Sequence, residues 1–152
     1  MDFIKEALTL GFNNAAVIDV KDLVFVLEYR QFCEENLCGN FNVISSCPPA
    51  CGTPEEMHRK ALNYKKALIL QTVLESPEEQ FDVKKAKYNH NILTEKLYKK
   101  MEADAETTPL LISAGPYKRF SCMSAYGIDA QKMADALGQT VSSLALEVEL
   151  SC

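Results

Sequence analysis

The sequence has no tryptophan, only two histidines, and fewer basic than acidic residues. Its 16 lysines and arginines stand against 21 aspartates and glutamates, which gives a formal net charge of −5. Nucleic-acid binding needs a basic surface, because contacts to phosphates dominate the affinity. The acidic balance therefore argues against a nucleic-acid partner.

Long apolar stretches are also missing. No run approaches the roughly 18 apolar residues that a membrane span needs. The first residues, MDFIKE, carry acids where a secretory signal would have a basic segment followed by an apolar run. We therefore expect a soluble, cytoplasmic protein with no membrane partner. The sequence also contains no P-loop and no GxGxxG segment.

The length and composition are those of an ordinary globular domain. The 152 residues fit one domain, by the usual prior of roughly 100 to 200 residues each. The hydrophobic fraction of 47% and the charged fraction of 24% are typical of soluble proteins. We predict a single domain over residues 1–152, with a cysteine-bearing loop at 33–52.

Hydrophobic periodicity predicts strands that alternate with helices. The clearest element is a helix with Thr53 as its N-cap, Pro54 as its first residue and Glu56 as its third. The expected helices are 2–10, 53–64, 83–103 and 129–137, and the expected strands are 15–20, 66–74, 109–113 and 143–150. This order favours an α/β layered sandwich, with a mixed, partly parallel sheet of about four to five strands flanked by helices.

The cysteines are the most informative feature of the chain. Four of the six lie within nineteen residues, in a segment rich in glycine, proline and asparagine. The cytosol keeps thiols reduced, so clustered cysteines there more often bind metal or do chemistry than form disulfides. Thiolates suit zinc and iron–sulfur clusters. The six are Cys33, Cys38, Cys47, Cys51, Cys122 and Cys152.

The cysteine spacing does not match the common metal motifs. It lacks the paired CxxC of zinc ribbons and the CxxCxxC run of ferredoxins. Buried inert cysteines and a redox-active pair therefore stay open as alternatives. His90 lies on the apolar stripe of the expected helix 83–103. A lone histidine there is more often a hydrogen-bonded core residue, and the alternative is a metal ligand or proton carrier that faces the cysteine loop.

Several segments resemble those of one known family: residues 33–41 (CEENLCGNF), 47–52 (CPPACG), 66–71, 110–116 (LLISAGP) and 122–129 (CMSAYGID). That family consists of bacterial and archaeal predicted metal-binding proteins of unknown function. The resemblance implies a cysteine-ligated metal, an iron–sulfur cluster above all, with Cys33, Cys38 and Cys47 as matching ligands and Cys51 as a less regular one. Family members carry a second cysteine-rich segment after the Ala114-Gly115-Pro116 turn, and here Cys122 is its only survivor. They also tend to have an aromatic residue within 43–46.

The leading hypothesis is a metal-binding protein that uses an iron–sulfur cluster, or alternatively zinc, in electron transfer or redox sensing with a partner protein. Its candidate ligands are Cys33, Cys38, Cys47 and Cys51, with Cys122 and His90 as weaker candidates. A second hypothesis is an interaction module whose loop is held by zinc or by packing alone. A third is an enzyme in which Cys51 is the nucleophile and His90 its base. The final strand could also pair across a homodimer axis.

Overall fold

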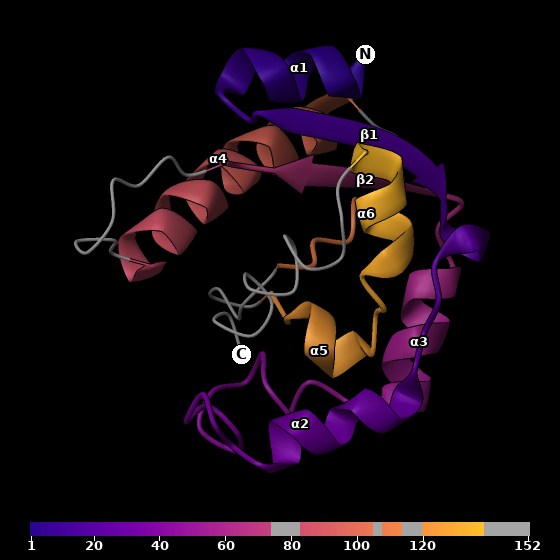
Figure 1. Cartoon of the computed structure of the whole chain (residues 1–152), viewed down its shortest axis with the longest axis vertical. Helices are drawn as coiled ribbons and strands as arrows, with labels where there is room; N and C mark the ends of the chain where they lie inside the picture. The colour runs from indigo at the N-terminus through magenta and orange to yellow at the C-terminus, as the bar shows by residue number, and fades with distance from the viewer. Residues whose placement is uncertain (74–82, 105–107, 114–119, 139–152) are drawn as a thin grey trace.

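The structure is a computed structural model that describes residues 1–73, 83–104, 108–113 and 120–138. Its helices and strands follow in the order shown in Figure 1, with α1 at one end of the molecule and α2 at the other. They are α1 (Phe3–Leu10), β1 (Asn14–Asp19), η1 (Val20–Asp22), η2 (Leu27–Tyr29), α2 (Arg30–Glu34), α3 (Pro54–Leu62), β2 (Lys66–Gln71), α4 (Val83–Asp104), α5 (Met123–Tyr126) and α6 (Gln131–Leu137). Within these ranges no helix is both long and apolar enough to cross a membrane.

The sheet differs from the predicted one. β1 and β2 form a two-stranded antiparallel sheet, in which Asn14 pairs with Gln71 and Asp19 with Lys66. The prediction of a layered α/β sandwich with a larger, mixed and partly parallel sheet was therefore wrong, because the described residues form this one sheet and six α-helices. In the expected strand 109–113, only Ser113 is bridged, to Cys122. The expected strand 143–150 lies outside the described residues.

The apolar run of β2 explains the error. A continuous apolar run is typical of a strand that is buried on both faces, as in a parallel sheet. Here the helices provide that burial for an antiparallel pair. The half-buried Leu68 and Leu70 pack against α1 and α4, while the alternation of the strand turns the buried Ile69 to the opposite face. Helix α6 also packs against both strands.

The elements predicted from local signals are confirmed. Helix α1 ends at Gly11, and α6 ends at Gly138, as the glycine positions indicate. Helix α3 begins after Thr53, whose Oγ1 accepts a hydrogen bond from the Glu56 N–H at 3.2 Å. Helix α4 covers almost the expected range.

Two hydrophobic clusters hold the described residues together. The first, here called the sheet core, joins α1, α4 and the two strands, and its buried members are Ala7, Phe12 and Leu97. The second, here called the sulfur core, lies among α2, α3 and α5, which are near one another in Figure 1. Its buried members are Cys33, Met57, Ala61, Cys122, Met123, Ala125, Tyr126 and Ile128, and Cys51 packs against them.

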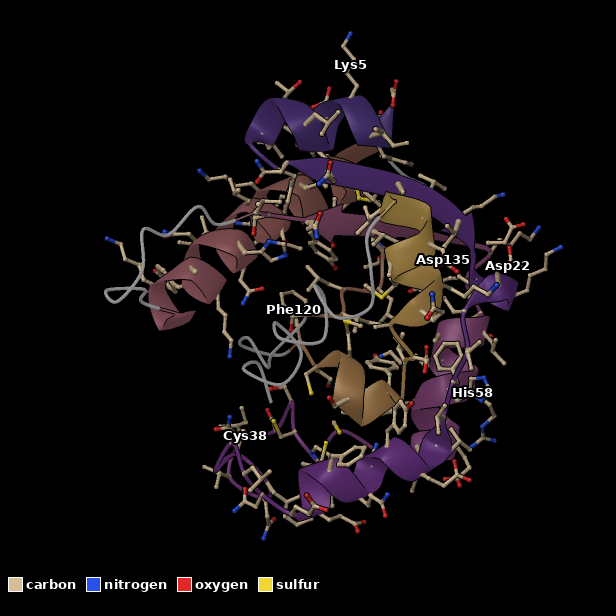
Figure 2. The ribbon with its side chains drawn as sticks, viewed as in Figure 1. Lys5, Asp22, Cys38, His58, Phe120 and Asp135 are labelled. Atoms are coloured by element: carbon tan, nitrogen blue, oxygen red, sulfur yellow. The ribbon has the colours of Figure 1, made fainter. Side chains whose placement is uncertain are left out.

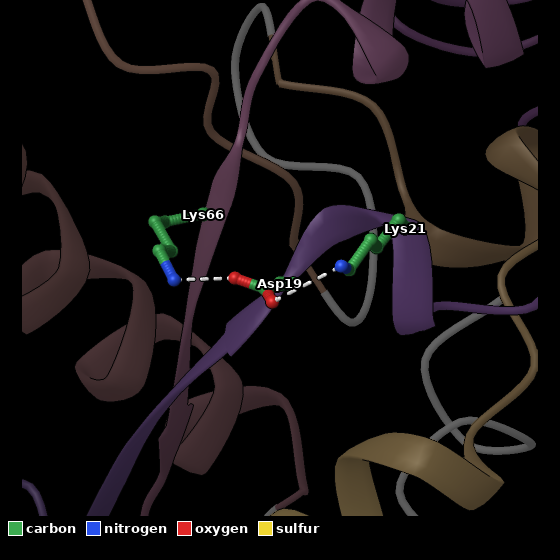
Figure 3. A network of polar contacts seen from close by, with 3 residues as sticks. All are labelled: Asp19, Lys21 and Lys66. Atoms are coloured by element: carbon green, nitrogen blue, oxygen red, sulfur yellow. Dashed lines mark hydrogen bonds and ion pairs between the residues drawn. The ribbon is translucent and has the colours of Figure 1, made fainter.

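An ion pair lies at the end of the strand ladder. Lys66 bonds to Asp19, its register partner across the sheet, and Lys21 approaches the same carboxylate at 4.0 Å (Figure 3). The hydrogen bond and charge of Lys66 lower the pKa of Asp19. Solvent screens such surface pairs, so this one favours the observed register more than it adds to stability.

Candidate metal centre

The structure places the candidate cysteines in different surroundings. Cys33 and Cys122 are buried members of the sulfur core, and Cys51 packs against the same core. Cys47 is also buried, with 4% of its surface exposed. Cys38 is exposed in the loop that follows α2 (Figure 2). Three of the candidates therefore meet in one core, although Cys122 is 71 residues after Cys51 in the sequence.

Three separate segments bring these thiols together. Cys33 lies on α2, and Cys122 is the residue that precedes the first turn of α5. Cys51 comes just before Thr53, the N-cap of α3, and its N–H donates to the Cys47 carbonyl at 3.2 Å. The positions of Cys33, Cys51 and Cys122 thus depend on the packing of α2, α3 and α5.

The loop between Cys33 and Cys47 is a chain of short turns. Most of its backbone hydrogen bonds join residues three apart: Asn36 to Cys33, Gly39 to Asn36, Val43 to Asn40 and Cys47 to Ile44. One reaches further, from the Asn42 N–H to the Pro48 carbonyl at 2.8 Å. The loop meets the rest of the protein through Phe41, which packs against the sulfur core. Two of its apolar side chains face solvent, with Leu37 85% exposed and Val43 69% exposed.

Arg30 ties the cysteine-bearing segments to one another. Its Nη1 donates to the Gly52 carbonyl at 2.7 Å, and its Nη2 donates to the Ala125 carbonyl and to the Met57 Sδ, both at 3.0 Å. Gly52 directly follows Cys51, and Ala125 lies on α5, which Cys122 precedes. Because Arg30 itself lies on α2 with Cys33, one side chain links all three segments.

The thiol of Cys51 shares its neighbours with this guanidinium. Its Sγ lies 3.5 Å from the Met57 Sδ and 3.9 Å from the Gly52 carbonyl oxygen, two atoms that also accept hydrogen bonds from Arg30. Burial raises the pKa of the Cys51 thiol, and the charge of Arg30 acts in the opposite direction. Burial also raises the pKa of Tyr126, to about 12, with a contribution from Cys51.

Two buried polar atoms beside the cysteines have no hydrogen-bond partner among the described residues. They are the Arg30 Nε, on the same helix as Cys33, and the Ser46 Oγ, next to Cys47. Native proteins rarely leave such atoms unsatisfied, and each exception calls for an explanation. Both atoms can donate a hydrogen bond, so an added acceptor in this region would satisfy them.

The donor set has the chemistry of a soft-metal site. Three cysteine thiols and the Met57 thioether meet in the sulfur core, and such sulfur donors select thiophilic metals. Within the described ranges, however, no three His, Cys, Asp or Glu side chains are arranged to hold a metal ion. The residues present therefore fit a thiolate-bound metal by type and by location, and binding would have to draw the thiols closer together.

His90 occupies a different part of the molecule. It lies on α4, where its Nδ1 is 2.9 Å from the Thr72 Oγ1. Its ring forms a T-shaped pair with the ring of Phe12, and the two ring centroids are 5.3 Å apart. Burial lowers the pKa of His90. These are the surroundings of a hydrogen-bonded core histidine. No described contact joins it to Cys51, as the enzyme hypothesis would need.

The comparison with known families gave a match. A family model described as "Predicted metal-binding protein (DUF2284)" matches residues 16–118. The chain belongs to this family. The matched region includes Arg30, Met57 and the cysteines from Cys33 to Cys51, and it ends before Cys122. The family's description names no particular metal. The comparison with curated proteins found no match, and neither did the comparison with solved structures.

Sequence reasoning missed Arg30 and Met57. The segment that contains Arg30 gave an ambiguous pattern, and in the structure it is divided between the 3-10 turn η2 and the short helix α2. One signal was present: Arg30 and Cys33 are three residues apart, which places both on one face of a helix. Met57 gave no such signal, because a methionine on a helix is more often simple core packing.

Proposed function

We propose that this member of the family binds its metal as an iron–sulfur cluster in the sulfur core, and that it acts in electron transfer or redox sensing with a partner protein. The observation that carries the proposal is the meeting of Cys33, Cys51 and Cys122 in the sulfur core, whose three segments are joined by the buried side chain of Arg30. Cysteine thiolates are the usual ligands of such clusters, and a bound cluster supplies one-electron chemistry.

The surroundings of Arg30 support a negatively charged centre. The side chain is only 9% exposed, and its acceptors are two carbonyl oxygens and a thioether. Among the described residues no carboxylate pairs with it. A buried charge without a counter-charge is strongly unfavourable, and a thiolate-bound cluster would provide that counter-charge.

The proposed ligands follow from burial and location. Cys33, Cys51 and Cys122 belong to the centre because they share the sulfur core. Cys47 is the fourth candidate, because it is buried and its carbonyl is hydrogen-bonded to Cys51. Cys38 is the candidate that would need the largest rearrangement, since it is exposed in the loop.

The exposed side chains of the loop favour a second candidate function. Leu37 and Val43 are 85% and 69% exposed, so the loop presents apolar surface to solvent. In an interaction module, these side chains would contact a partner, and zinc or packing alone would hold the loop. This role needs no change in oxidation state at the cysteines.

Anaerobic purification followed by absorbance spectroscopy and by iron, sulfide and zinc analysis tests the proposal. We expect a brown protein that contains iron and sulfide. Cys33→Ser, Cys51→Ser and Cys122→Ser should each lose the cluster, while Cys38→Ser shows whether the loop also contributes a ligand. A colourless protein with one zinc would support the interaction module instead. A protein that takes up no metal after reconstitution with iron and sulfide or with zinc would contradict the iron–sulfur proposal and leave only an interaction module whose loop is held by packing.

A further inference from the structure

We propose that Arg30 is a positioning residue of the metal centre: its guanidinium balances the negative charge of the bound thiolates and donates the free Nε–H to a sulfur of the bound group. The inference deepens the proposed function and rests on it. In this inference Arg30 is not a ligand. Its positive charge makes the site prefer an anionic metal centre.

The hydrogen bonds of Arg30 account for only part of its side chain. Its two Nη atoms reach Gly52, Met57 and Ala125, which explains how it joins α2, the start of α3 and α5. The Nε has no partner, although it is buried. A purely structural clasp explains the Nη bonds and leaves both the Nε–H and the charge unexplained.

The location of the charge supplies the missing explanation. The guanidinium and the Cys51 thiol contact the same two atoms, the Gly52 oxygen and the Met57 Sδ. Cys33 lies one helical turn after Arg30 on α2. The cation therefore lies beside the Cys51 thiol and on the same helix face as Cys33, in surroundings where solvent screens little and charge interactions are strong.

A cation in this place has two measurable consequences. It strengthens the binding of a thiolate-bound metal, because hydrogen bonds to charged groups are about twice as strong as those between neutral groups. It also raises the reduction potential of an iron–sulfur cluster, since the potential depends on net charge and on hydrogen bonds to the sulfurs. A residue that only held the fold together would produce neither effect once the protein is folded.

The test compares the full-length protein with Arg30→Gln, which removes the charge, and Arg30→Lys, which keeps the charge but lacks the planar group of donors. Arg59→Gln is the matched control, because it removes the same charge from an exposed position on α3. Each protein is titrated with Co(II) against a competing chelator, and its reconstituted cluster is titrated for its midpoint potential. Metal-free unfolding curves verify that each variant is folded.

We expect Arg30→Gln to bind Co(II) roughly ten- to a hundredfold more weakly than the wild type, and to shift the cluster to a lower potential. The affinity and the potential of Arg30→Lys should lie between those of the wild type and of Arg30→Gln. Those of Arg59→Gln should match the wild type. If Arg30→Gln does not fold, Arg30→Lys decides by the same readouts. A wild type that binds metal, with Arg30 variants of equal affinity and potential, overturns this inference alone. A wild type that binds no metal overturns the proposed function and this inference with it.

Discussion

The Cys51 Sγ lies 3.5 Å from the Met57 Sδ, and that same methionine sulfur accepts a hydrogen bond from Arg30 at 3.0 Å. Met57 is 3% exposed, so this contact lies inside the protein. Besides packing in the core, the Met57 side chain thus connects the Cys51 thiol to the Arg30 guanidinium. The relationship makes Met57 the side chain through which the two groups are coupled in the metal-free protein.

Met57→Leu should destabilise the protein by about 1–3 kcal/mol, because leucine fills a similar volume but leaves a buried Arg30 N–H without its acceptor. Met123→Leu is the control, since Met123 belongs to the same core and has no hydrogen bond to Arg30. Chemical denaturation of both variants measures the difference. Equal losses of unfolding free energy would mean that the sulfur contact contributes only packing.

Gly127→Ala should destabilise the protein by about 3 kcal/mol or more. Gly127 has a φ of +74°, and an added Cβ would lie 2.3 Å from the Val26 carbonyl oxygen. The same glycine accepts a hydrogen bond from the Val26 N–H, so the clash would separate residues 24–27 from α5. Gly138 has a similar φ, and no atom lies within 4 Å of the Cβ that an alanine would add there. Gly138→Ala should therefore cost only about 1 kcal/mol of unfolding free energy. Thermal unfolding that gave the two variants the same midpoint would exclude the close approach as the cause.

The stability of the protein should fall below pH 6.5 in a way that depends on His90. Burial lowers the pKa of His90 from its ordinary value of 6.5 in the folded state. The unfolded chain therefore takes up a proton before the folded protein does, and stability that is complete above pH 6.5 is lost as the pH falls. His90→Gln should remove this part of the pH dependence. Denaturation curves measured from pH 7.5 to pH 5 check the slope, and parallel slopes for both proteins would contradict the expectation.

Thr53→Ala should cost about 1 kcal/mol of unfolding free energy, because it removes the side-chain acceptor for the Glu56 N–H at the start of α3. Thr53→Ser keeps the hydroxyl and should lose much less. Since α3 carries Met57 and Cys51 lies only two residues before its N-cap, the alanine variant should also weaken metal binding slightly. Denaturation gives the first effect and Co(II) titration the second.

Sequence signals that act over a few residues predicted the structure well. The N-cap at Thr53 and the glycine that ends α1 concern atoms within one helical turn, so neighbouring residues determine them. The pairing of β1 with β2 depends on residues about 50 positions apart. The apolar run of β2 indicates burial on both faces, but it contains nothing that distinguishes a parallel partner from an antiparallel one.

The candidate site likewise combines features that the local sequence predicts with features that depend on tertiary packing. Clustering in the sequence indicated the cysteines of the loop, and the chain belongs to a family of predicted metal-binding proteins. Their division into buried Cys33 and Cys47 and exposed Cys38 follows from tertiary packing. The link from Arg30 to Ala125 joins residues 95 positions apart, and no local pattern in the sequence predicts it.

The short turns between Cys33 and Cys47 have a consequence for how a metal would enter the protein. Most backbone hydrogen bonds of this segment reach three residues along the chain and the one from Asn42 to Pro48 reaches six, so they can break and re-form without disturbing α1, α4 or the sheet. We therefore expect the amide hydrogens of this segment to exchange with solvent through local opening, long before those of the sheet core. Such opening would loosen the segment around Cys38 and Cys47 while α1, α4 and the sheet stay folded. A metal could then enter, or be handed over by a donor protein, without global unfolding.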